Sequence, residues 1–546
     1  MKLERVKIQN YRSIKELEFE VGDLCALIGP NNVGKSNILS ALALVLGETW
    51  PTTRAIELAD FYAYSDGDMV ITVWFDQERE TRGDVGSSVK YSGIQFKIDR
   101  YKRKTGEKEP GDLKSSFVCV DKDGNPVNIL KRPNPQAKPY QSPAQVTSDI
   151  RGELPAVIID VDRNARYHLS GSSRSIFGRM LADIAKELKK DSKRFKAFLD
   201  KFEEARELLR TKEFEELEKN LAEQLKRHTG LRELSLQLDG LDPINLYKNF
   251  SILFKDPDTP ELVDFERMGS GVQSALVMSL LQVYREMKKE NAILLFEEPE
   301  LYLHPHGRRH LFRLLKELSE NGVQIIYTTH SQDFVDLESF ESVRLVYKTK
   351  DAGTKVKTPD VSKVTGDWKS RVKHLAEPKN EAFFARKVII VEGPTEHLAI
   401  RRLADMMEPT LELDLYDCSV IEAGSKTAIP ILVRIMAAIE KPVMVIYDTD
   451  SDKTDPQDVA TNEKRERDIQ EAVKVHGSAL TFKCDPCFEA VAGIEEPRKH
   501  EKPEHMMVHL DAAGDWNGVS AELKRLMEEI VRFVTRGDDS SDGYPS

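Results

Sequence analysis

Two groups of residues in this chain have the types and spacing needed for chemistry on phosphates. The first is GPNNVGKS at residues 29–36, which fits the G-x-x-x-x-G-K-[ST] pattern of a phosphate-binding loop. The second pairs VEGPTE at residues 391–396 with VIYDTD at residues 445–450, so that acidic side chains follow two apolar runs. We expect the first group to bind a nucleotide and the second to hold divalent metal for chemistry on phosphodiesters. Together they predict an ATP-controlled enzyme that acts on nucleic acid.

The glycines of the first group let the backbone turn tightly, so that its N–H groups face the phosphates of a nucleotide. Lys35 is expected to reach the β- and γ-phosphates, and Ser36 is expected to hold Mg²⁺. The residues predicted to bind ATP near the N-terminus are Arg12, Gly29, Asn31, Asn32, Gly34, Lys35, Ser36 and Asn37.

Three later segments supply the other parts that ATP hydrolysis needs. AILLFEEPE at residues 292–300 predicts an apolar strand that ends in carboxylates, with Glu297 in the metal shell and Glu298 polarising the attacking water. VQIIYTTHS ends a second apolar strand at His330, which is placed to sense the γ-phosphate. RMGSGVQS at residues 267–274 precedes a predicted helix, and its backbone N–H groups are suited to binding a phosphate.

The acidic residues of the second group are spaced to converge. Glu392 follows a predicted strand and Glu396 lies one helical turn further on, whereas Asp448 and Asp450 lie two apart at a strand end and are expected to project to the same side. Hard oxygen ligands of this kind suit Mg²⁺ or Mn²⁺, one or two ions at this site. The alternative, that these acids only cap helices and solvate loop ends, is preferred for Asp452 alone.

The elements around both groups have α/β patterning. LCALIG predicts a buried strand before the phosphate loop and SNILSALALVLG predicts a helix after it, which is the context that the motif requires. From residue 386 onward, predicted strands alternate with helices, which indicates a small parallel sheet. Residues 173–228 are charged and helical, and they either pack on their own domain or form a dimerisation arm. Their apolar stripe consists of Phe214, Leu217, Leu221 and Leu225.

A chain of 546 residues is too long for one core, so two or three domains are expected. We predict a nucleotide-binding domain in two parts around a helical insertion, a polar linker, an α/β nuclease-like domain and a disordered tail. The two parts of the nucleotide-binding domain are residues 1–172 and 231–347, and the helical insertion is 173–230. The linker is 348–385, the nuclease-like domain is 386–535 and the tail is 536–546.

Composition narrows the class of protein further. The net charge of −12 argues against a wholly basic surface, although a local basic channel for DNA is compatible with it. No apolar run approaches the roughly 18 residues that span a bilayer, and five cysteines are few, so we expect a cytoplasmic protein without membrane contact. Cys484 and Cys487 form a single C-x-x-C, which is favoured as two ordinary thiols over a zinc site.

The order of GPNNVGKSN, MGSGVQS, FEEPELYLHP and TTHS resembles an ABC-type ATPase head of the SMC/RecF class, and NYRS at residues 10–13 matches that class as well. In such heads the signature of one protomer closes over ATP held by the other. The resemblance therefore implies that Ser270, Gly271 and Gln273 act in trans and that the protein is at least a dimer. Glu297 stands where most of these ATPases have Asp, a departure that bears on hydrolysis rate rather than on ATP binding.

The C-terminal half resembles a Toprim domain, and the whole arrangement is similar to the OLD (overcoming lysogenisation defect) family of ATP-dependent nucleases. EAGSK, with Gly424 and Ser425, matches the small-residue turn after the second Toprim strand. Lys502 matches a late lysine that stabilises charge on the phosphate. The residues that match the metal-binding acids of the family are Glu392, Glu396, Asp448, Asp450 and Glu489.

The family resemblance implies a metal-dependent DNA endonuclease gated by ATP, in defence of bacteria against phage and with a separate helicase as a partner. The alternative is an ATP-driven DNA repair or recombination factor whose Toprim-like domain only binds DNA; the intact carboxylate set argues against it. A topoisomerase or primase is disfavoured, because we find no domain to present a nucleophilic tyrosine and no zinc module of the primase kind.

Overall fold

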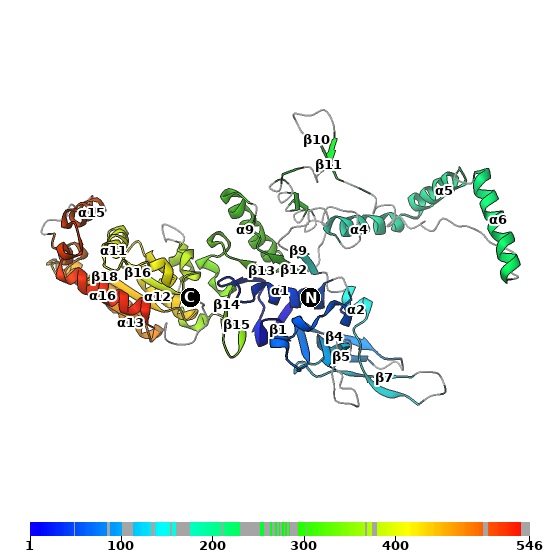
Figure 1. Cartoon of the computed structure of the whole chain (residues 1–546), viewed down its shortest axis with the longest axis horizontal. Helices are drawn as coiled ribbons and strands as arrows, with labels where there is room; N and C mark the ends of the chain where they lie inside the picture. Colours follow the sequence, from blue (N-terminus) through cyan, green and yellow to red (C-terminus); the bar gives the residue numbers. More distant parts are fainter. Residues whose placement is uncertain are drawn as a thin grey trace. The chain divides into compact units, whose positions relative to one another are not determined.

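A mixed sheet of 11 strands forms the nucleotide-binding half of the chain in the computed structural model. The strands lie in the order β6-β5-β4-β1-β2-β15-β14-β3-β13-β12-β9 (Figure 1). Their bounds are β1 (Leu3–Tyr11), β2 (Ile14–Glu20), β3 (Leu24–Ile28), β4 (Met69–Arg82), β5 (Ser88–Arg100), β6 (Leu113–Val120), β9 (Ala156–Ile159), β12 (Ile293–Glu297), β13 (Gln324–Thr329), β14 (Val343–Thr349) and β15 (Gly353–Lys357).

The structure describes the chain apart from residues 48–49, 85–87, 101–112, 133–135, 137, 153–155, 160–174, 209–210, 230–249, 251, 256–261, 265–267, 270–271, 273–275, 278, 281–282, 284–292, 302, 366–367, 374–378, 495–500 and 537–546. Helices around the large sheet are α1 (Lys35–Leu46), α2 (Ser148–Gly152), α9 (Pro305–Glu320) and α10 (Trp368–Lys373), and the short 3-10 helices η5 (Gln332–Phe334) and η8 (Asn380–Phe383) lie later in the chain. Strands β7 (Asn128–Lys131) and β8 (Tyr140–Pro143) form a separate hairpin.

Parallel pairing brings the functional ends of three strands to one edge. Strand β13 pairs in parallel with both β3 and β12, so that Thr329 lies beside Ile28 and Thr328 lies beside Glu297. The loops that follow parallel strands meet at the same edge of a sheet, which is where α/β proteins bind their ligands. The phosphate loop after β3, the acidic end of β12 and the end of β13 before His330 are therefore neighbours.

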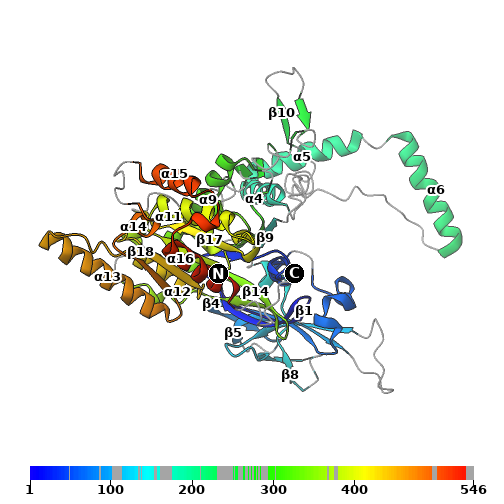
Figure 2. The same cartoon turned by 60° about the vertical axis from the view of Figure 1, so that its left-hand side comes forward.

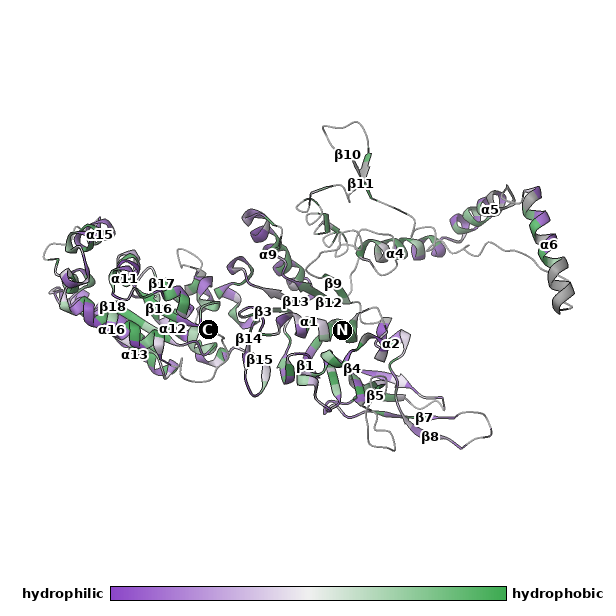
Figure 3. Cartoon of the chain, in the orientation of Figure 1, coloured by the Kyte–Doolittle hydropathy of each residue, from purple (hydrophilic) through white to green (hydrophobic). Residues whose placement is uncertain are grey.

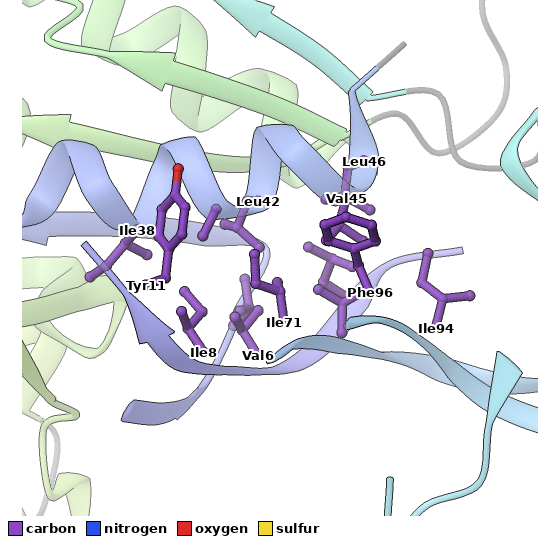
Figure 4. Close-up of a cluster of buried hydrophobic side chains, with 14 of the residues drawn as sticks. Val6, Ile8, Tyr11, Ile38, Leu42, Val45, Leu46, Ile71, Ile94 and Phe96 are labelled. Carbon is purple, nitrogen blue, oxygen red and sulfur yellow. The ribbon is translucent and has the colours of Figure 1, made fainter. Parts of the chain in front are cut away.

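Helix α1 secures the phosphate loop by packing on this sheet. Its buried side chains Ile38, Leu42 and Val45 contact an apolar layer that includes Val6 and Ile8 of β1 (Figure 4). The layer continues across the antiparallel strands β4 and β5. Because the helix begins at the end of the loop, fixing the helix also fixes the loop.

The predicted linker over residues 348–385 is wrong in part, because it contains a strand of the large sheet. The lysine-rich stretch within residues 348–385 was expected to connect two domains, but it contains β15, which pairs with β14 and touches β2 within the large sheet. Thr354 of this strand is fully buried although its neighbours in sequence are polar. A short two-sided strand with lysines on its exposed side lacks the apolar alternation that would have identified it.

Residues 159–290 and 302–304 make up a separate compact unit. Its described elements are α4 (Ile176–Lys190), α5 (Ser192–Leu208), α6 (Lys212–Thr229), β10 (Leu253–Lys255) and β11 (Leu262–Asp264). The predicted helical character of this region is present, and Leu217 and Leu221 of α6 are half-exposed. The side chain of Leu225 lies outside the described residues, and the role of this region as a dimerisation arm stays a prediction.

The C-terminal part of the chain is built on a four-stranded parallel sheet in the order β17-β16-β18-β19. Every residue of β16 is buried, which explains its continuous apolar run (Figure 3). Helices surround these strands (Figure 2), as predicted from the alternating pattern. The bounds are β16 (Lys387–Val391), α11 (Pro394–Met406), β17 (Cys418–Glu422), α12 (Ile429–Ala438), β18 (Val443–Asp448), α13 (Pro456–His476), β19 (Leu480–Cys484), α14 (Phe488–Ala492), α15 (Lys502–Ala513) and α16 (Ala521–Thr535).

The structure confirms the predicted α/β class with a parallel C-terminal sheet. Within the described part of the chain, no helix has the length and apolar character to cross a membrane.

Candidate functional site

The phosphate loop depends on two glycines in left-handed or extended positive-φ conformations. Gly29 has φ of 150° and Gly34 has φ of 103°. A Cβ atom on Gly29 would collide with the carbonyl oxygen of Val346, and one on Gly34 would collide with Thr354 Oγ1 and Ser13 Oγ. Both the dihedral and the space therefore require glycine, which is the reason for the spacing of the motif.

Lys35 is buried at the start of α1 and folds back over the loop. Its Nζ donates hydrogen bonds to the carbonyl oxygens of Gly29 at 2.9 Å and Pro30 at 2.7 Å. Burial lowers the pKa of Lys35 to about 8, an effect opposed by the negative charges of Glu298 and Glu300. An ammonium with only neutral acceptors is poised to exchange them for the oxygens of a phosphate.

Glu298 and His330 face each other at the edge of the sheet. Glu298 follows β12 with φ of 43°, and its N–H donates to the backbone carbonyl and the hydroxyl of Thr328, each at 3.1 Å. His330 Nε2 lies 3.8 Å from Glu298 Oε1. Burial, reinforced by the charge of Lys35, lowers the pKa of His330 to about 4, so the imidazole is neutral at pH 7. The pair can orient a water molecule without forming an ion pair.

Glu300 is a supporting residue that the sequence reasoning missed. It is buried, and its Oε1 accepts hydrogen bonds from Thr329 Oγ1 at 2.8 Å and from the His330 N–H at 2.7 Å. Burial raises the pKa of Glu300. The carboxyl thus fixes the backbone that carries His330, and its position two residues after Glu298 was the only available signal.

The other predicted nucleotide-binding residues are distributed around the loop. Arg12, with φ of 47°, donates from Nε to Asp60 Oδ1 at 2.8 Å. Asn37 donates to Ser13 Oγ at 2.7 Å, which in turn contacts Thr354 Oγ1 at 2.7 Å. Residues of the loop itself that are exposed are Asn31, Asn32 and Ser36. The signature residues Ser270, Gly271 and Gln273 lie outside the described part of the chain.

Four carboxyl groups converge at the ends of the C-terminal strands. Glu392 directly follows β16, Glu396 lies in the first turn of α11, Asp448 is the last residue of β18 and Glu489 lies in α14. Burial raises the pKa of Glu396 to about 7, with repulsion from Glu392 and Glu489 adding to it. Burial, with repulsion from Glu396 and Glu392, raises the pKa of Asp448 to about 8. The carboxylates therefore act on one another electrostatically, in addition to the effect of burial.

Two oxygens of this group have no hydrogen-bond partner although they are buried, namely Glu392 Oε2 and Glu489 Oε2. The other oxygens are partly engaged, since the Phe488 N–H donates to Asp448 Oδ1 at 2.9 Å and the Gly393 N–H donates to Glu396 Oε2 at 3.1 Å. An unpaired buried carboxylate oxygen is costly, and a divalent cation would satisfy it. The donor type of the group therefore suits a divalent cation such as Mg²⁺ or Mn²⁺.

The carboxylates are not arranged as a finished coordination shell. Within the described ranges, no three side chains of the metal-ligating types are gathered tightly enough to hold an ion as they stand. Lys502 Nζ lies 2.9 Å from Glu489 Oε1, so this carboxylate already forms an ion pair. Metal binding therefore requires a change in the positions of these acids, Glu392, Glu396, Asp448 and Glu489, which we call the carboxylate cluster.

Strand alternation does not apply to Asp450, which was expected to project to the same side as Asp448, although burial and, to a lesser degree, the charge of Asp450 raise the pKa of Glu392. Asp450 lies two positions beyond the end of β18, has φ of 51°, and donates its N–H to the Pro486 carbonyl at 2.7 Å. Its two carboxylate oxygens contact Lys426 Nζ at 3.2 Å and Lys453 Nζ at 3.0 Å. Because the chain turns after Asp448, the neighbours of Asp450 are set by tertiary contacts.

Lys426 is the second residue that the sequence reasoning missed. It follows Gly424 and Ser425 in the turn after β17 and is 2% exposed. The small residues of EAGSK were noted in the sequence, whereas the lysine beside them was not assigned a role. A lysine next to such a turn was the available signal, because a long side chain can reach the neighbouring strand end.

Two family models match the chain. One is described as an AAA ATPase domain and matches residues 1–335, and the other is described as an overcoming lysogenization defect protein-like TOPRIM domain and matches residues 383–450. The two matched ranges contain the phosphate loop and most of the carboxylate cluster, respectively.

Known proteins resemble the chain over most of its length. An OLD nuclease from Thermus scotoductus is 28% identical over 98% of this chain and 99% of its own length. The Old nuclease of Escherichia phage P2 is 23% identical over 82% of this chain and 77% of its own length. A solved SMC head bound to the C-winged helix domain of ScpA covers 67% of this chain and 100% of its own, with 16% identity and a TM-score of 0.38, a likeness too distant to add to the argument.

Proposed function

Because this chain belongs to the OLD nuclease family, which joins an AAA ATPase domain to an OLD-like Toprim domain, we propose that it is a divalent-metal-dependent DNA endonuclease controlled by ATP. The observation that carries the proposal is the carboxylate cluster, with two buried oxygens that lack a partner. A group of acids at parallel strand ends suits metal-assisted attack on a phosphodiester.

Within the carboxylate cluster, we assign Glu392, Glu396 and Asp448 to hold Mg²⁺ or Mn²⁺, with Glu489 and Asp450 as further ligands. Bound ions of this kind activate the nucleophile and stabilise the leaving oxygen of a phosphodiester. The residues of the chain orient these ligands: the Gly393 N–H holds Glu396 and the Phe488 N–H holds Asp448.

Lys502 has a separate role in the proposal. Its ammonium lies 2.9 Å from Glu489 and is about two-fifths exposed, so it is accessible to a DNA phosphate at the rim of the cluster. A lysine ammonium presents a compact positive charge to a phosphate. We assign Lys502 to stabilise charge that develops on the scissile phosphate.

The ATP site is assigned by the same reasoning. Lys35 binds the β- and γ-phosphates, Ser36 and Glu297 hold Mg²⁺, Glu298 polarises the attacking water and His330 senses the γ-phosphate. Support comes from the burial of Lys35 and from the proximity of Glu298 to His330. Assembly into at least a dimer, with the signature segment acting in trans, belongs to the proposal as well.

Control by ATP has a candidate structural route through η8. Asn380 Nδ2 donates to the carbonyl oxygens of Gln332 at 3.0 Å and Val335 at 2.8 Å, just after His330 in the chain. The next residue, Glu381, accepts a hydrogen bond from Ser419 Oγ of β17 at 2.6 Å. Glu298, His330 and Glu381 line one cavity of about 460 Å³. We propose that these contacts relay movement at the ATP site to a strand of the nuclease sheet.

The test is incubation of purified protein with supercoiled plasmid and Mg²⁺ or Mn²⁺, with and without ATP. Wild-type protein should nick or cleave the plasmid, EDTA should stop the reaction, and Asp448→Ala should lower the rate by orders of magnitude while ATP hydrolysis survives. Ca²⁺ should support cleavage poorly, since its coordination is looser. DNA binding without any cleavage would favour the repair or recombination factor instead.

A matched variant tests the route of control. Asn380→Ala removes both hydrogen bonds to the segment after His330 and leaves the carboxylate cluster and the phosphate loop intact. Plasmid cleavage should then respond several-fold less to ATP, whereas the rates of ATP hydrolysis and of cleavage without ATP should stay near those of the wild type. An unchanged response to ATP would exclude η8 as the route.

The family resemblance extends the proposal to defence of bacteria against phage, with a separate helicase as partner. Plaque counts on cells that express the wild type or Asp448→Ala, with and without a co-expressed helicase, test both parts. Equal plaque counts for the two proteins would remove the defence role without affecting the nuclease proposal.

A further inference from the structure

Lys426 is the least exposed lysine among the described residues, at 2%. Its ammonium has three donors, and three acceptors receive them: the Asp448 carbonyl at 2.5 Å, Asn462 Oδ1 at 2.5 Å and Asp450 Oδ2 at 3.2 Å. Two of these acceptors belong to the turn that carries the aspartates. A buried lysine is costly unless it is satisfied in this way, so its place here needs a reason.

Asn462 of α13 completes the arrangement from the other side. It is buried, and its Nδ2 donates to the Thr449 carbonyl at 2.5 Å while its Oδ1 accepts from Lys426. The backbone carbonyls of Asp448 and Thr449 are thereby both engaged by buried side chains. We call Lys426 and Asn462 together the aspartate clamp.

The turn held by the aspartate clamp is one that the chain does not adopt readily. Asp450 has φ of 51°, in the left-handed region that residues with a side chain adopt less readily than glycine. Asp450 is also the residue that strand geometry leaves undirected. The clamp supplies the missing constraint from two segments, 22 residues before Asp448 and 12 residues after Asp450.

We propose that Lys426 is a positioning residue that, with Asn462, fixes the Asp448–Asp450 turn in the geometry from which both aspartates reach a divalent ion. The inference deepens the proposed nuclease function and rests on it for the identity of the ligands. It assigns Lys426 no contact with DNA and no proton transfer.

Lys453 allows the effect of holding the turn in place to be distinguished from the effect of a positive charge beside Asp450. Its Nζ contacts Asp450 Oδ1 at 3.0 Å, but its side chain is 37% exposed and the pair is an i,i+3 neighbour contact. Exposed ion pairs of this kind contribute little. The Lys453 side chain thus places a positive charge on the same carboxylate as Lys426 and, within the described part of the chain, forms no hydrogen bond to the backbone of the turn. The Lys453 backbone N–H donates to the Asp450 carbonyl at 3.3 Å, and Lys453→Met keeps that bond, which makes it a matched control.

The experiment measures Mn²⁺ binding to the full chain without nucleotide, from the electron paramagnetic resonance signal of free Mn²⁺, in the wild type, Lys426→Met, Asn462→Leu and Lys453→Met. We expect the two clamp variants to weaken Mn²⁺ binding about tenfold, because Asp450 loses its fixed direction, and Lys453→Met to change it less than about twofold. Calorimetric melting and the rate of ATP hydrolysis establish that each variant is folded.

Folded Lys426→Met with wild-type Mn²⁺ affinity would overturn the inference, and so would a loss in Lys453→Met as large as that in Lys426→Met, since charge alone would then explain the effect. If Lys426→Met does not fold, Asn462→Leu decides, because it keeps the lysine and removes only its partner. Wild-type protein that binds Mn²⁺ but does not cleave DNA would overturn the proposed function and leave this inference standing on the binding data.

Discussion

Replacing Asp448 by Asn should stabilise the protein when no metal is bound. The acid is buried and its pKa is raised to about 8, whereas an ordinary Asp has a pKa of 3.8. At pH 7.5 the folded chain therefore retains a proton that the unfolded chain has released. The free energy of unfolding falls as pH rises from 3.8, the ordinary pKa, toward 8, the pKa in the folded chain. Over this range the chain must bind a proton in order to fold.

The size of the expected stabilisation follows from the difference between the pKa of Asp448 in the folded chain, about 8, and the ordinary value of 3.8. Each pKa unit corresponds to about 1.4 kcal/mol, so the protonation of Asp448 that accompanies folding costs at most about 5 kcal/mol at pH 7.5 and at most about 2 kcal/mol at pH 5. Asn does not ionise, and its side-chain oxygen can still accept the hydrogen bond that Asp448 Oδ1 accepts from the Phe488 N–H. For a domain of this size the melting temperature should rise by about 5–15 °C at pH 7.5 and by clearly less at pH 5.

Differential scanning calorimetry in EDTA at both pH values measures the effect. Asp452→Asn is the control, because Asp452 is an exposed aspartate close by in the chain and should leave the melting temperature unchanged. Addition of Mn²⁺ should reverse the order, since the wild type gains stability from the bound ion and Asp448→Asn gains less. Asp448→Asn that melts at the wild-type temperature in EDTA at pH 7.5, or with equal gains at both pH values, would refute the reasoning.

Three further predictions concern the ATP-binding half. Glu298→Gln should keep ATP bound but slow phosphate release by about 100-fold or more, because the amide cannot polarise water; a wild-type rate would mean that another residue is the base. Gly34→Ala should weaken ATP binding at least tenfold in calorimetric titration, because its Cβ would collide with Thr354 and Ser13; unchanged affinity would contradict the requirement for glycine. Light scattering should report at least a dimer with an ATP analogue, and a monomer in all conditions would remove the trans-acting signature.

Much of the fold follows from local patterns that the sequence carries by itself. The phosphate loop is recognisable because a tight turn needs Gly29 and Gly34 whatever surrounds it. The run from Val388 to Val391 predicts a buried parallel strand because a strand covered on both faces is almost continuously apolar. Acids placed directly after such strands, as at Glu392, fall at the sheet edge without further information.

The residues that hold the site residues in place cannot be recognised from a local sequence pattern. Glu300 holds the backbone of His330, and Thr354 supports the phosphate loop from a strand that looks like a linker. Neither contact leaves a periodic signal, because each joins a side chain to a backbone group in a segment that lies far away in the chain.

The direction of Asp450 shows where local reasoning ends. The sequence by itself determined that the two aspartates follow a strand, that both are acidic and that a metal ion suits them. Only the tertiary structure decided that the chain turns after Asp448, and that Lys426 and Asn462 hold this turn. The physical reason is that hydrogen-bond partners of a turn outside regular structure are chosen by which buried side chains the fold brings within reach, and no spacing in the sequence encodes that choice.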